Sequence, residues 1–223
     1  MKHSTLRLLA LTTALGLGLS ACSGGSTAPS GPSMSSDAAT GAEADARALL
    51  EAGGISRKGL VEELTAAGHS KEEATAAIEA LEVDWNEQAK QSAEMHLELS
   101  GFSEKGLVQQ LQFNGFTREQ AAAGAKAVDL HEGKQADRVA KSYLKSSPFS
   151  RSGLVDQLVY DGFDEKDATR AVAGLDTDWK AQAVRAAKEH QKEKKVSRDK
   201  LAETLLTEGY TDAQAKAAAR AAG

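Results

Sequence analysis

The stretch SEKGLVQQLQFNGFTREQA, residues 103–121, decides the fold, because related stretches begin at residues 56, 150 and 197, at intervals of 47 residues. Four columns keep this spacing: the serines Ser56, Ser103, Ser150 and Ser197; the leucines Leu64, Leu111, Leu158 and Leu205; the glycines Gly68, Gly115, Gly162 and Gly209; and the alanines Ala74, Ala121, Ala168 and Ala215. Four copies without a gap predict an array of modules of about 45 residues rather than one large globule.

Each module is expected to form three helices. In the second module the first helix begins after Asp84, a predicted N-cap with Glu87 at N3, and ends near Leu99. Its apolar stripe recurs every four residues, at Trp85, Ala89, Ala93 and Leu97. The next helix begins at Ser103 and stops at Gly115, the residue type best able to take the left-handed conformation at C′. This predicts a Schellman motif in which Leu111 packs against Phe116.

The third helix of each module is expected to begin with a capping box. Thr117 is the predicted N-cap of the second module, with Gln120 at N3. The same pairs recur in the other modules as Ser70 with Glu73, Asp164 with Asp167, and Thr211 with Gln214. An aromatic residue before the cap is expected to pack on the alanine that follows, as Phe116 on Ala121, Phe163 on Ala168 and Tyr210 on Ala215. These aromatic residues are therefore assigned a structural role.

Composition excludes several classes of protein. The 223 residues are 4% aromatic and include one cysteine, so a disulfide scaffold is excluded and a large β-sandwich is disfavoured. Leucine and alanine must supply the core, which favours an all-α fold. The 27 basic and 32 acidic residues give a net charge of −5, whereas DNA binding needs a basic face, so no nucleic-acid partner is expected.

Residues 1–21 have the pattern of a secretory signal peptide, in which a positively charged start precedes an uncharged leucine-rich run at residues 8–19. A bilayer-spanning helix needs about 20 apolar residues, so this run is too short to span as a mature helix. The sequence Leu19-Ser20-Ala21-Cys22 resembles a bacterial lipobox. Cys22 is therefore the predicted lipidation site, and its lipid would hold the protein on the outer face of the cell membrane. The alternative is an ordinary signal peptide followed by a chance cysteine.

Residues 22–42 are rich in Ser, Gly, Ala, Thr and Pro and predict a flexible tether after the lipidated cysteine. The four repeats are then expected at residues 43–83, 84–130, 131–177 and 178–223. Their net charge rises along the chain from −5 in the first to +3 in the last.

The last module carries a basic run that is the candidate partner-binding patch: Lys192, Lys194, Lys195, Arg198 and Lys200. One interpretation is a surface for an anionic partner, such as teichoic acid or an acidic protein. The other is a solvent-exposed helix end, where the negative end of the helix dipole stabilises basic side chains. The sequence leaves both open.

Catalysis is not expected, and no catalytic residue, metal site or cofactor is predicted. The histidines His69, His96, His131 and His190 are scattered, and no two of them have a helical metal-ligand spacing. His96 and His190 share the column of Tyr143, which favours a packing role. The chain has neither a phosphate-binding glycine loop nor a nucleophile motif.

The third module carries a family resemblance. It contains Phe149-Ser150-x-x-Gly153-Leu154-x-x-Gln157-Leu158 and Gly162-Phe163, and Asp178-Trp179-x-x-Gln182-Ala183 follows. With the lipobox and tether, this pattern resembles the Ltp family of host cell surface-exposed lipoproteins, from Glu43 to the C-terminus. The second repeat departs from the family pattern, because His131-Glu132 stands where the family has Asp-Trp, and His69 replaces the aromatic residue of the first.

The resemblance implies helix-turn-helix-like repeats in a surface lipoprotein of a phage, prophage or bacterium. Some members confer superinfection exclusion by blocking injection of an incoming phage genome. One hypothesis is therefore an immunity lipoprotein that meets a phage tail component or the injection machinery at the membrane. The other is a host envelope protein whose repeats bind wall polymer or another surface protein.

Overall fold

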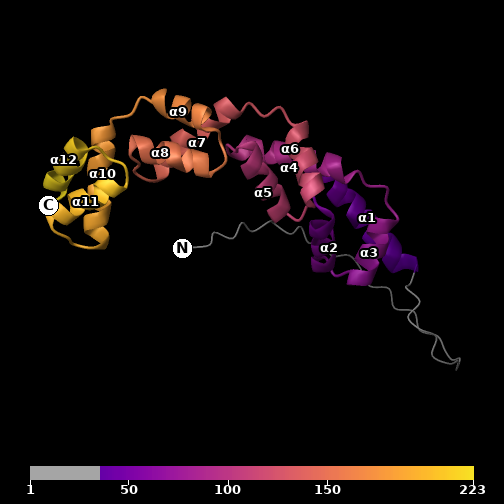
Figure 1. Cartoon of the computed structure of the whole chain (residues 1–223). Helices are drawn as coiled ribbons and strands as arrows, with labels where there is room; N and C mark the ends of the chain where they lie inside the picture. The colour runs from indigo at the N-terminus through magenta and orange to yellow at the C-terminus, as the bar shows by residue number, and fades with distance from the viewer. Residues whose placement is uncertain (1–35) are drawn as a thin grey trace, which may run out of the picture. The chain divides into compact units, whose positions relative to one another are not determined.

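The computed structural model describes residues 36–223, and over that range the chain forms twelve helices and no strand. The helices follow one another in four groups of three (Figure 1). Their bounds are α1 Ser36–Ala52, α2 Arg57–Ala66, α3 Lys71–Glu79, α4 Trp85–Leu99, α5 Glu104–Phe113, α6 Arg118–Ala127, α7 Glu132–Ser146, α8 Arg151–Tyr160, α9 Glu165–Ala173, α10 Trp179–Glu193, α11 Arg198–Thr207 and α12 Asp212–Ala222. The predicted all-α array of three-helix modules is confirmed.

Each module has a small hydrophobic core of its own. In the second module, the fully buried Leu107 and Leu111 of α5 pack with alanines of α4 and α6. Small residues let the helices approach closely: a Cβ added at Gly124 of α6 would come within 2.6 Å of the Ala89 backbone in α4. The other three modules repeat this arrangement with their own pair of buried leucines. Four separate cores therefore follow one another along the chain.

The predicted end of the second helix is confirmed in detail. Gly115 has a φ of 93°, in the left-handed region. Its N–H donates to the carbonyl of Gln112 at 3.0 Å, and the N–H of Phe116 donates to the carbonyl of Leu111 at 3.2 Å. These two bonds are the Schellman motif.

The capping boxes follow the prediction in three modules of four. Both reciprocal bonds are present at Ser70, Thr117 and Thr211. In the third module, Asp164 accepts from the backbone N–H of Asp167, but no return bond forms, so this predicted box is only half present. The Asp167 carboxylate is one methylene shorter than that of Glu, and it pairs instead with Arg170 at 3.4 Å.

The start of the folded region differs from the prediction. Composition predicts a tether through residue 42, whereas α1 begins at Ser36 and Ala42 is fully buried. The reason is that alanine is both a common linker residue and the strongest helix former. Ala42 and Ala46, four residues apart, lie on the buried face of α1.

Successive modules are joined by a hydrogen bond from a buried serine. The Oγ of Ser103 accepts the N–H of Gly106 at 3.0 Å and donates to the carbonyl of Asp161, in the next module, at 2.5 Å. One hydroxyl thus caps a helix and binds the neighbouring module. The same bond joins the other two pairs of modules: Ser56 to Asn114 at 2.7 Å, and Ser150 to Glu208 at 2.6 Å.

Side chains of the first helix in a module reach back to the module before it. Arg185 donates to the carbonyls of Leu144 at 2.8 Å and Ser146 at 3.1 Å, at the end of α7. Trp85 and Trp179 pack against the cores of the preceding modules. Trp85 therefore serves the junction with the first module, while Ala89 and Ala93 on the same predicted stripe serve the core of their own module.

We expect Ser150→Ala to lower the free energy of unfolding by about 1 kcal/mol more than Ser197→Ala. Both changes remove an N-cap, which costs about 1 kcal/mol. Only Ser150 also binds a following module, and a buried hydrogen bond contributes about 1 kcal/mol. Guanidinium denaturation followed by circular dichroism measures both losses. Equal losses would show that the junction bond adds no stability.

Candidate functional site

At each junction, a ring near the C-terminal end of a module's first helix faces the C-cap residue of the second helix of the same module. The Tyr143 hydroxyl donates to Oδ2 of Asp161 at 2.7 Å. In the equivalent places, Asn114 Nδ2 lies 2.6 Å from His96 Nε2, and His190 Nε2 lies 2.7 Å from Glu208 Oε1. Burial lowers the pKa of His96, which favours the neutral ring that can accept the amide hydrogen. The residues of this column thus contact the C-cap residue by hydrogen bonds, and the predicted packing role is present at His96, which packs on Phe102, and at Tyr143, which packs on Phe149.

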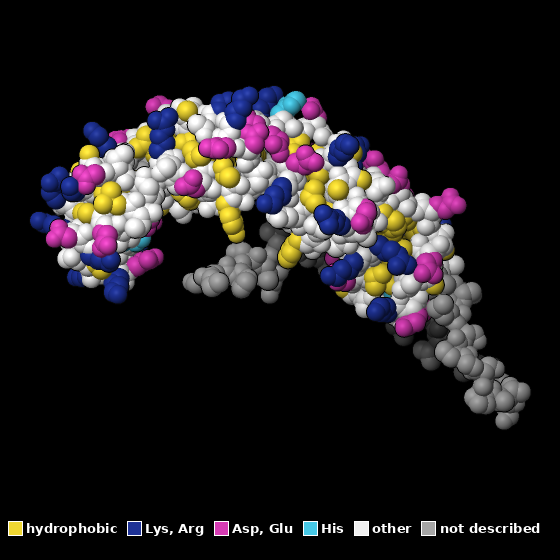
Figure 2. Space-filling view, in the orientation of Figure 1, with side chains coloured by type: hydrophobic (Ala, Val, Ile, Leu, Met, Phe, Trp, Pro, Cys, Tyr) yellow, Lys and Arg dark blue, Asp and Glu magenta, His cyan; other side chains and the backbone are white. Residues whose placement is uncertain are grey.

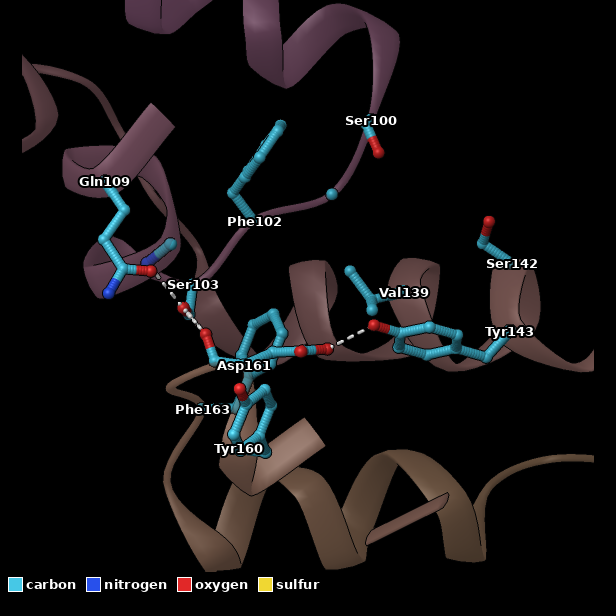
Figure 3. Close-up of a pocket in the computed structure, with 12 residues that line it drawn as sticks. Ser100, Phe102, Ser103, Gln109, Val139, Ser142, Tyr143, Tyr160, Asp161 and Phe163 are labelled. Carbon is cyan, nitrogen blue, oxygen red and sulfur yellow. Dashed lines mark hydrogen bonds between the residues drawn. The ribbon is translucent and has the colours of Figure 1, made fainter. Parts of the chain in front are cut away.

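A cavity of about 380 Å³ lies at the second junction, between the second and third modules (Figure 3). Its walls are aromatic and polar, and in Figure 3 the Tyr143 hydroxyl points toward the central Asp161. The lining residues include Ser100, Phe102, Gln109, Ser142, Tyr143, Tyr160, Asp161 and Phe163. The amide of Gln157 donates to Oδ1 of Asp161 at 3.0 Å, so two donors fix this carboxylate from within the third module.

The other two junctions differ at this place. A cavity of about 380 Å³ also lies at the third junction, but Glu189, Glu193 and Glu208 line it. At the first junction Met95 stands where Ser142 stands at the second, and a Cβ added at Gly54 would come within 1.9 Å of the Met95 Cε. The Met95 side chain therefore fills the corresponding space.

We expect the Tyr143 phenol to ionise near pH 12. Burial, together with the hydrogen bond to Asp161, raises the pKa of Tyr143 to about 12. In the unfolded chain tyrosine ionises near pH 10, so the contribution of this phenol to stability is complete below about pH 10 and is lost as the pH rises toward 12. The phenolate absorbance that Tyr143→Phe removes locates this titration. A difference centred near pH 10 would contradict the expectation.

The candidate basic patch is exposed at the end of the array. Of the five patch residues, Lys192 lies on the last turn of α10. Lys194 and Lys195 follow that helix, and Arg198 and Lys200 lie in the first turn of α11. Lys200 pairs with Glu203 at 2.8 Å, and within residues 36–223 the other four make no ion pair. Basic side chains are spread over the surface of this module in Figure 2.

Three of these lysines occupy columns in which the earlier modules carry glycine or serine, with Pro148 as the one exception. Lys195 corresponds to Gly101, where an added Cβ would come within 2.7 Å of Val139 in the next module. Lys200 corresponds to Gly153, where an added Cβ would come within 3.0 Å of the Glu208 carbonyl. Lys194 likewise corresponds to Ser147 and Ser100. Part of the patch therefore occupies columns that lie against the next module in earlier modules.

Two predicted features, the signal peptide at 1–21 and Cys22, lie outside the described residues. Within residues 36–223, no group of His, Cys, Asp and Glu could hold a metal ion, and no helix is long and apolar enough to cross a membrane. His69 pairs with Asp45 at 2.8 Å, and His131 pairs with Asp129 at 3.3 Å. Each of these two histidines therefore contacts one carboxylate.

Comparison with known proteins identifies the repeats. The family described as host cell surface-exposed lipoproteins, Lipoprotein_Ltp, matches residues 84–123, 131–175 and 178–218, more than half of the chain. No curated protein and no solved structure matches. The first module lies outside the matched ranges, yet α1–α3 repeat the caps, the buried leucines and the junction serine of the others. The chain belongs to the Ltp family of host cell surface-exposed lipoproteins.

Proposed function

We propose that this lipoprotein is anchored to the outer face of the cell membrane by lipid on Cys22 and acts there without catalysis. Its helical array serves as a protein-interaction module that excludes superinfecting phages by blocking genome injection. The observation that carries the proposal is the membership of three tandem modules in a family of surface-exposed lipoproteins. A serine hydroxyl hydrogen-bonds each of the first three modules to the module that follows it, and this supports a continuous binding surface along the array.

Geometry supports an action close to the membrane. Thirteen residues, 23–35, separate the predicted lipid anchor from α1, and a chain of that length spans at most about 45 Å. Such a tether confines the array to the layer that an injecting tail must cross, which raises its effective concentration there. Phage receptors farther out would remain free.

The test is infection of a susceptible host that expresses the full chain. The expected result is a reduced plating efficiency with unchanged phage adsorption. Cys22→Ser is the matched control: at equal expression it should lose fatty-acid labelling and protect less. Unchanged plating over a broad phage panel, or a fall in adsorption itself, would contradict exclusion at the injection step.

A second candidate function rests on the exposed basic patch. An envelope protein could use Lys192, Lys194, Lys195 and Arg198 to bind an anionic wall polymer, because none of these four is paired within the described chain. Pull-down on cell walls with and without their teichoic acid tests this function. Retention that depends on teichoic acid and is lost when the four residues are changed to Ser supports it.

A further inference from the structure

Tyr160 has an exposure that the fold does not explain. It ends α8 at the rim of the second-junction cavity and is 81% exposed. The equivalent residues of the first and last modules are Ala66 and Thr207, so this helix ends equally well without an aromatic ring. In Figure 2 some hydrophobic side chains stand out from the surface of the array. A ring in this place adds nothing to a core, but it does add a flat apolar wall to a cavity.

The remaining walls supply two kinds of hydrogen-bonding group: a carboxylate held in place by bonds within the third module, and polar side chains that make no bond within the described chain. Each oxygen of the Asp161 carboxylate accepts one bond from within the module and keeps a second lone pair. Three further polar side chains line the cavity, namely Ser100, Gln109 and Ser142, and these are exposed and unbonded within the described chain. The cavity therefore offers both donors and acceptors beside the rings of Phe102 and Tyr160.

This combination fits a sugar ring. A pyranose has an apolar face of C–H groups, which packs on an aromatic ring, and an edge of hydroxyl groups that each donate and accept. A volume of about 380 Å³ lies within the usual range of small-ligand sites. A purely apolar ligand would bury the Asp161 carboxylate without a new partner, and an anionic ligand would be repelled by it. A neutral saccharide meets neither penalty.

Each of the other two junctions lacks either the open cavity or the exposed aromatic ring. The first has an exposed ring, Phe113, 84% exposed, at the position of Tyr160, but the Met95 side chain fills the cavity beside it. The third has a cavity of the same size, but Thr207 replaces the ring and glutamates line the walls. Phe149 and Tyr210 also line the third cavity, but neither is an exposed ring at its rim. Among the three described junctions, the second alone combines a cavity with an exposed aromatic ring.

We propose that the cavity at the second junction binds a neutral saccharide, with Tyr160 stacking on the sugar ring and Asp161, Gln109 and Ser142 binding its hydroxyl groups. The site is separate from the basic patch, and it depends on neither candidate function above.

The test is calorimetric titration of the full chain, purified in detergent, with neutral trisaccharides of N-acetylglucosamine, glucose, galactose and rhamnose. At least one should bind, and Tyr160→Ala should weaken its binding about tenfold or more, because a stacking contact is lost. Tyr160→Phe keeps the ring and should retain most of the affinity.

Phe113→Ala is the matched control. It removes an equally exposed aromatic residue from the same helix position, beside a filled cavity, and should leave the binding unchanged. Circular dichroism of every variant shows whether the array remains folded. The proposal is overturned if no neutral trisaccharide binds, if only charged saccharides bind, or if Tyr160→Ala and Phe113→Ala have the same effect.

Discussion

Replacing Leu158 with alanine should lower the free energy of unfolding of the third module by about 3 kcal/mol. Leu158 is fully buried in a core that also contains Leu154, Phe163 and the alanines of α7 and α9. Such a small core has no second layer of side chains that could move in to fill the vacated space. Guanidinium denaturation followed by circular dichroism measures the loss.

The control for this change is Val159→Ala, at the adjacent position of α8. Val159 is 42% exposed, so its truncation should cost less than about 0.5 kcal/mol. Valine is a poorer helix former than leucine, so the change to alanine regains some helix propensity at Val159, and the main difference between the two positions is burial. A similar loss in both would mean that the third module does not fold around Leu158.

Gly115→Ala should cost about 2 kcal/mol, from two separate causes. The φ of 93° at Gly115 strains any residue with a Cβ. The added Cβ would also come within 2.7 Å of the Ser56 Oγ, the atom that joins the first module to the second. The change therefore disturbs a helix end and a junction together.

Gly68→Ala separates these causes. Gly68 ends α2 with a φ of 107°, but an added Cβ there would meet nothing within 4 Å. Its substitution should show the backbone strain alone, about 1 kcal/mol. If Gly68→Ala and Gly115→Ala cost the same, the contact with Ser56 is not a constraint on the junction.

The local parts of the fold could be predicted from the sequence because their causes lie within a few residues. The Schellman motif at Gly115 and the capping box at Thr117 depend on neighbours at most five positions away. The Ser70 and Thr211 boxes were predictable for the same reason. The box at Asp164 failed because pattern matching treats Asp and Glu as equivalent, although their carboxylates reach different distances.

The junctions and the cavity could not be predicted in this way. Ser103 and its acceptor carbonyl are 58 residues apart, and no local pattern reports such a pair. A signal nevertheless exists: the N-cap of the second helix is serine in all four modules, whereas that of the third helix is Ser, Thr, Asp and Thr. An Asp caps a helix equally well but cannot donate a hydrogen, so a column without Asp indicates a second partner for the hydroxyl.

The lysines at the end of the array constrain how a chain of this kind can change in length during evolution. Lys194, Lys195 and Lys200 occupy columns in which glycines of earlier modules, among them Gly53, Gly101 and Gly153, lie against the next module. A gene duplication that appends a copy after residue 223 would set a new module against these side chains. A duplication of residues 131–177 would instead place glycine and serine at the new contact. In longer relatives, a module that is followed by another module should therefore carry no lysine in these three columns.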